Sequence, residues 1–212
     1  MEGILDLLNS DLGKQIVSGV AGSTGTDTNK TSSVLTMALP VLMKGMERNA
    51  SSPEGAAGLL NALNNKHDGS ILDNLSGLFN GGVDDSVKQD GVGILGHILG
   101  GKQNGVQQVI GQKSGLDADT VGNILKIAAP LVMGYLGKQK NNQNIANSGD
   151  LTGLLGGLLG GNSAKSEQNF LEQILDADGD GSVVDDVAGM LLGGNKKSGG
   201  GLGGMLGGLF GK

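Results

Sequence analysis

Apolar residues recur at intervals of three or four positions along most of the chain, which is the spacing of one face of an α-helix. Strict alternation of apolar and polar residues is scarce, and β-branched residues do not cluster. The pattern therefore predicts an all-α fold. The two strongest apolar runs lie around Pro40 and Pro130, and further helices are expected at roughly 2–8, 11–22, 53–64, 70–79, 84–99, 103–113, 150–159 and 166–175.

The runs around the two prolines resemble each other at a fixed offset of 130 − 40 = 90 residues. At the same offset, Thr24–Asp27 aligns with Ser114–Asp117, where an aspartate suited to cap a helix precedes each run. We therefore predict a helical bundle over residues 1–140 built from two duplicated units, at about 10–65 and 100–155. A proline inside each run removes a backbone donor and favours a bend at matching places.

The composition is rich in glycine and poor in large side chains. The 212 residues include 42 glycines, no cysteine and no tryptophan, and the net charge is −6. This charge argues against non-specific nucleic-acid binding, which needs a basic surface. No apolar run approaches the roughly 18–20 residues of a membrane span, and the first residues lack the pattern of a signal peptide. A cytoplasmic protein is expected.

Beyond about residue 140 the character of the sequence changes. Residues 141–165 are rich in Asn and Gly, which predicts a linker with a short helix. Residues 166–193 form a separate acidic module, and the Gly-rich segment 194–212 is expected to be a flexible tail.

The acidic module carries the clearest chemistry in the sequence. Calcium takes six to eight oxygen ligands from a short loop, with acidic residues at positions 1, 3 and 5 and glycine at position 6. Asp176, Asp178, Asp180 and Gly181 match these positions, and Ser182 would supply its backbone carbonyl at position 7. We predict one Ca²⁺ site.

The loop departs from the usual pattern at position 12, where Val187 replaces a bidentate glutamate. Asp185 and Asp186 precede it, and Asp186 closes the predicted ligand set of Asp176, Asp178, Asp180, Ser182 and Asp186 if the loop is one residue tighter. Which of Asp185 and Asp186 closes the site stays open. The alternative is a solvated acidic turn without a metal, which the mutual repulsion of five carboxylates disfavours.

Two other patterns suggest chemistry less specifically. Gly91–Gly96 fits the G-x-G-x-x-G spacing of dinucleotide-binding loops, but the polar residues before it do not form the strand that this motif requires. His67 and His97 are candidates for a hydrolase acid–base pair. Nothing in their spacing brings them together, so structural histidines are the preferred interpretation.

The segments Gly91–Gln103 and Ala129–Gly134 resemble the bacterial domain-of-unknown-function family 937. The resemblance covers roughly residues 1–160, with the Asp-rich loop as a C-terminal addition. It implies a bacterial, helical protein and brings no established activity or catalytic residues.

The expected function is therefore a non-enzymatic scaffold or interaction protein with one Ca²⁺ loop. Its partner would be an unidentified protein or a second copy of the chain. The alternative is a self-assembling or surface-associated protein that uses its two Gly-Leu segments, 153–161 and 203–211. A hydrolase using His67 or His97 is the least favoured interpretation.

Overall fold

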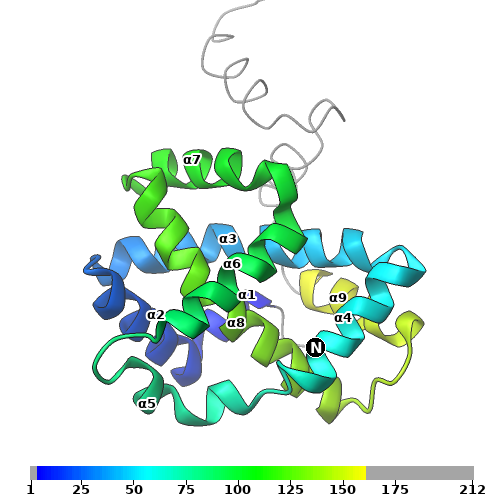
Figure 1. Ribbon diagram of the computed structural model, residues 1–212. Helices are drawn as coiled ribbons and strands as arrows, with labels where there is room; N and C mark the ends of the chain where they lie inside the picture. The colour runs from blue at the N-terminus through cyan, green and yellow to red at the C-terminus, as the bar shows by residue number, and fades with distance from the viewer. Residues whose placement is uncertain (1–3, 161–212) are drawn as a thin grey trace, which may run out of the picture.

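The computed structural model describes residues 4–160, and every regular element in that range is helical. The prediction of an all-α fold is confirmed for this part of the chain (Figure 1). The elements are α1 (Ile4–Asn9), α2 (Asp11–Thr24), α3 (Thr28–Ala50), α4 (Pro53–Asn65), the 3₁₀ turn η1 (Ser70–Asn74), α5 (Leu75–Phe79), α6 (Asp85–Leu99), the 3₁₀ turn η2 (Gly100–Lys102), α7 (Gln103–Ser114), α8 (Ala118–Asn142) and α9 (Ser148–Gly160).

Helix α8 lies at the centre of this body. Every residue from 127 to 137 is buried, which is the pattern of a helix that is apolar on all sides and enclosed by others. It packs against α2, α3, α4, α6, α7 and η1. Helix α3 is the second long core helix, and it contacts α8 directly.

Helix α8 is also the one helix among residues 4–160 that is long and apolar enough to cross a membrane. However, 78% of its most apolar 18-residue window is buried within the structure. The core helix of a folded protein meets the same criterion, and the enclosed position of α8 accounts for its composition.

The two segments that align at an offset of 90 residues have matching helix ends. Gly25 ends α2 and Gly115 ends α7, both in the left-handed conformation at φ 64° and 68°, where glycine is favoured. Asp27 accepts hydrogen bonds from the backbone N–H groups of Asn29 and Lys30, and Asp117 accepts one from the N–H of Thr120. The capping roles of these two aspartates are confirmed, and α3 and α8 both continue past their proline.

The contacts between the aligned segments are reciprocal. Helix α2 packs against α3 and also against α8, while α7 packs against α8 and also against α3. Lys30, in the first turn of α3, donates a hydrogen bond from Nζ to the carbonyl of Gly115 at 3.2 Å. The two helix–turn–helix corners therefore interlock around the α3/α8 pair.

Residues 148–160 lie within the range that composition assigns to a linker with a short helix. They form α9, which packs against α3 and α4 (Figure 1). The buried side chains of α9 occupy positions i, i+3, i+4 and i+7, and they are Leu151, Leu154, Leu155 and Leu158. This spacing places them on one helix face, so α9 is part of the hydrophobic core.

Helices α6 and α8 approach closely because α6 carries glycine at the contact. A side chain at Gly91 would meet the backbone carbonyl of Lys126 in α8, whereas one at Gly93, in the same helix, would enter open space. The two glycines differ in role although they are two residues apart.

We therefore expect Gly91→Ala to lower the free energy of unfolding by about 1–3 kcal/mol, because the methyl group forces α6 away from α8. Gly93→Ala is the matched control, and it should leave stability unchanged or raise it by up to about 1 kcal/mol through its higher helix propensity. Urea unfolding of the two variants measures both effects. Shifts of the same sign and size would contradict the close contact at Gly91.

Candidate functional site

The predicted calcium ligands Asp176, Asp178, Asp180, Ser182 and Asp186 lie outside the described residues, as do the acidic module 166–193 and the tail 194–212. The Ca²⁺ site therefore stays a prediction from the sequence. Within residues 4–160, no group of three or more His, Asp or Glu side chains is placed to hold a metal ion.

The segment Gly91–Gly96 lies inside α6 and not in a loop after a strand. Gly91 faces the backbone of α8, and Gly93 and Gly96 face open space. Helix packing at Gly91 and exposure at Gly93 and Gly96 therefore describe these glycines, and the absence of a preceding strand in the described residues agrees with the sequence analysis.

His67 is the buried titratable side chain around which a small polar cluster forms. It follows the last turn of α4, where the N–H groups of Lys66 and His67 both donate to the carbonyl of Ala62 at 3.0 Å. Its Nε2 lies 3.5 Å from Oδ2 of Asp90 in α6, and Lys66 Nζ lies 3.3 Å from Oδ1 of the same carboxylate. The cluster joins the end of α4 to α6.

The turn after His67 is fixed to the C-terminal half of α8. A side chain at Gly137 would meet the carbonyl oxygen of His67, so glycine is required there for the turn to lie against the helix. Asn141 donates from Nδ2 to the carbonyl of Asp68 at 3.0 Å, and Lys138 pairs with Asp73 at 3.0 Å. Burial and these contacts place His67 among three helices: α4, α6 and α8.

The environment of His67 disfavours its charged form. Removal from water lowers the pKa of the imidazole, and the nearby Lys66 ammonium lowers it further, while Asp90 and Asp68 oppose the shift. The net direction is downward, so the folded protein favours the neutral form of His67.

His97 lies in the same helix as Asp90 but seven residues further along, since 97 − 90 = 7. At 1.5 Å per residue this is about 10 Å along the helix axis. Its side chain is exposed, and its backbone carbonyl accepts a hydrogen bond from Asn49 Nδ2 at 2.6 Å. His67 therefore meets Asp90 and not His97.

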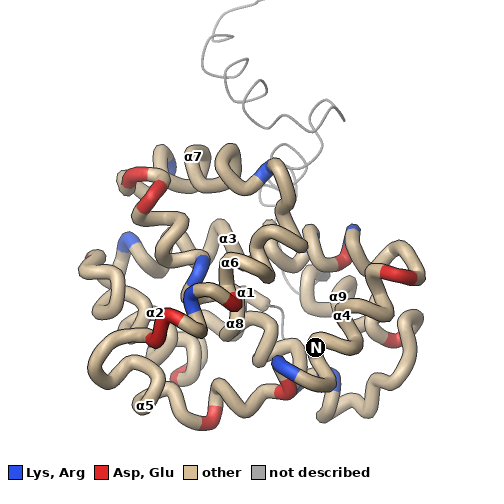
Figure 2. Tube along the Cα trace, viewed as in Figure 1, with Lys and Arg blue, Asp and Glu red and all other residues tan. Residues whose placement is uncertain are grey.

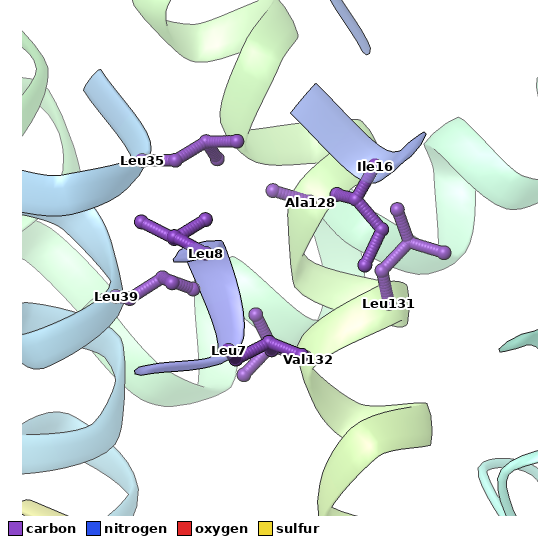
Figure 3. A pocket seen from close by; sticks show the side chains of 8 residues that line it. All are labelled: Leu7, Leu8, Ile16, Leu35, Leu39, Ala128, Leu131 and Val132. Carbon is purple, nitrogen blue, oxygen red and sulfur yellow. The ribbon is translucent and has the colours of Figure 1, made fainter. Parts of the chain in front are cut away.

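An apolar cavity lies where α1 covers the α3/α8 pair (Figure 3). Its volume is about 10 Å³, and its walls are the side chains of Leu7, Leu8, Ile16, Leu35, Leu39, Ala128, Leu131 and Val132. A single water molecule needs about this much space together with polar partners. The cavity is a packing gap under α1 and is too small for an organic ligand.

The pairing of His67 with Asp90 could not be predicted from the sequence. His67 stands out in the sequence because the chain has two histidines, but Asp90 lies 23 residues away, since 90 − 67 = 23, with no local pattern to connect them. The position of Asp90 directly before Gly91 is the one available signal, because a side chain at that glycine would meet the backbone of α8.

The lowered pKa of His67 predicts a loss of stability in mild acid. The unfolded chain binds a proton at His67 near pH 6.5, while the folded protein resists doing so until a lower pH. The free energy of unfolding should therefore fall as the pH drops below about 6.5, by at most about 1.4 kcal/mol per pH unit for one proton.

Unfolding in urea between pH 5 and 7.5 measures this slope, and His67→Gln should flatten it. His97→Gln is the matched control, because it replaces the other histidine of the chain, which lies exposed on α6. The account fails if His97→Gln flattens the slope and His67→Gln does not.

A search of curated proteins and a search of solved structures each found no match. Residues 6–139, well over half of the chain, match the model of the family described as bacterial protein of unknown function, DUF937. The chain therefore belongs to the DUF937 family of bacterial proteins.

Proposed function

We propose that this DUF937 protein is a non-enzymatic scaffold or interaction protein that binds one Ca²⁺ ion in the loop 176–187. The observation that carries the proposal is the order of residues in that loop. Asp176, Asp178 and Asp180 stand at the first three ligand positions, and Gly181 stands where the loop must turn sharply. Ser182 contributes its carbonyl, and Asp186 closes the site.

The position of the loop along the chain supports an accessory role. Helix α9 is anchored on α3 and α4, and the acidic module begins at residue 166, shortly after α9 ends at Gly160. The helical body therefore supplies a fixed attachment point for the calcium module. A single loop of this kind acts as a local stabiliser of the segment around it.

The two histidines lie at different places in the helical body, and each takes part in a contact between helices. His67 is buried against Asp90 where α4, α6 and α8 meet, and His97 uses its backbone carbonyl to hold Asn49. Basic and acidic residues are interspersed over the helices in Figure 2, and several form pairs, such as Lys44 with Glu47. The two histidines therefore do not meet at a shared acid–base site, which favours the binding interpretation over a hydrolase.

We further infer that the two interlocked helical units descend from one duplicated unit. The supporting observations are the matched glycine ends at 25 and 115, the aspartate caps at 27 and 117, and the prolines at 40 and 130. Helices α4 and α9 extend the correspondence between the two units, because each follows a core helix and each has 13 residues. Their starts are 148 − 53 = 95 positions apart.

Calorimetric titration of the full chain with Ca²⁺ tests the proposal. The wild-type protein should release or absorb heat at one site per chain, and Asp178→Ala should abolish it because a central ligand is lost. Asp119→Asn, which removes an exposed carboxylate in the first turn of α8, is the matched control and should bind like the wild type.

Asp185→Asn and Asp186→Asn identify the closing ligand. We expect Asp186→Asn to weaken binding more strongly than Asp185→Asn. Absence of heat in the wild-type protein, or equal heat in Asp178→Ala, would contradict the calcium assignment.

A further inference from the structure

The last residues of the chain repeat the sequence of α9. With an offset of 202 − 151 = 51, residues 202–211 and 151–160 are identical at seven of ten positions. The identical pairs are Leu151/Leu202, Gly153/Gly204, Leu155/Leu206, Gly156/Gly207, Gly157/Gly208, Leu158/Leu209 and Gly160/Gly211. Two of the remaining pairs are conservative, because Met205 replaces Leu154 and Phe210 replaces Leu159.

The structure shows what these positions do in α9. Leu151, Leu154, Leu155 and Leu158 are buried where α9 lies on α3 and α4 (Figure 1). Gly156 is directed toward α3, since a Cβ atom there would lie 3.9 Å from Oε1 of Glu47. Gly153 faces open space. The segment therefore has a defined inner face and a defined outer face.

The terminal segment meets the same requirements. Leu202, Met205, Leu206 and Leu209 hold positions i, i+3, i+4 and i+7, which places four large apolar side chains on one face of a helix. Exchange of leucine for methionine preserves volume and is among the best tolerated changes in a core. Glycine at 207 and 208 preserves the small positions that α9 has at 156 and 157.

We propose that the surface of α3 and α4 beneath α9 is a docking site for residues 202–211 of the same chain, which exchange with α9. Helix α9 is the resting occupant because residues 143–147 tether it directly to α8. When the terminal segment takes its place, the four buried leucines of α9 are released and present a new apolar face.

The length of the chain favours the same molecule over a second copy. Residues 161–201 number 41, since 201 − 160 = 41, and a random chain of this length has an end-to-end distance of about 35 Å. The site itself is about 20 Å long, the length of a 13-residue helix. A tether that spans this distance gives the terminal segment an effective concentration in the millimolar range at the site. In a micromolar solution of the protein, the terminal segments of other molecules are present at a much lower concentration.

Disulfide trapping in the full chain tests the proposal directly, because the protein has no cysteine of its own. Glu47→Cys with Gly156→Cys reports α9 in its site and is the positive control. Glu47→Cys with Gly207→Cys is the test, because residue 207 is the counterpart of 156. Glu47→Cys with Gly204→Cys is the matched control, because residue 204 corresponds to the outward-facing Gly153.

We expect the 47–207 bond to form within one chain at least about fivefold faster than the 47–204 bond, because residue 207 in the docked register takes the place of Gly156, which faces the Glu47 side chain, whereas residue 204 takes the place of the outward-facing Gly153. Leu206→Asp should remove this difference by placing a charge on the docked face. Leu155→Ala, checked for retained helicity by circular dichroism, should raise the 47–207 rate by weakening α9.

The experiment is run with a calcium chelator, so its outcome is independent of the proposed Ca²⁺ site. Equal rates for the 47–207 and 47–204 pairs would overturn the proposal. A 47–207 bond found mainly between two chains would overturn the assignment to the same molecule. A 47–207 rate unchanged by Leu155→Ala in a folded variant would overturn the competition with α9.

Discussion

The enclosure of α8 by its neighbours is the constraint on which the rest of the structure depends. Eleven consecutive residues, 127–137, are buried, so every face of this stretch needs a helix or turn against it. The polypeptide supplies few large aromatic side chains to fill the space, with three phenylalanines, one tyrosine and no tryptophan. The core is closed instead by bringing backbones near one another.

Glycine makes that close approach possible at particular positions. Gly91 lets α6 lie against the carbonyl of Lys126, Gly137 lets the turn at His67 lie against α8, and Gly134 faces Ile71 from η1. These contacts explain why a chain with so much glycine still forms long helices. Each interior glycine lowers helix stability by about 1 kcal/mol. Tertiary packing offsets this loss where two backbones lie so close that there is no room for a side chain. Gly93 and Gly96, which face open space, have no such contact.

Much of the helical body could be predicted from the sequence because its signals are local. The aspartates at 27 and 117 mark helix starts, the glycines at 25 and 115 mark helix ends, and the apolar spacing around each proline marks the core helices. The role of α9 in the core was harder to recognise. Its four buried leucines have helical spacing, but the surrounding glycines and the Asn-rich residues before it resemble a linker in composition. Only the surface of α3 and α4 shows what those leucines cover.

The polar cluster at His67 shows a second feature that the sequence alone does not predict. A burial-induced shift in pKa depends on which helix closes over the imidazole, and the partner Asp90 comes from α6, beyond η1 and α5. No sequence spacing encodes that pairing. Conversely, the strongest chemical pattern in the sequence, the aspartates at 176, 178 and 180, follows the helical body and lies outside the described residues. Residues 4–160 form the packed helical body, and the segments with proposed binding roles follow it in the sequence.

Amide hydrogen exchange measured residue by residue tests the central claim about α8 most directly. If α8 is held by all its neighbours, its amides between residues 127 and 137 should exchange only through global unfolding and be the slowest in the protein. The amides of α4 and α9 should exchange faster through local opening. Exchange of α8 at the same rate as α9, or faster, would contradict the view that the fold is built around it.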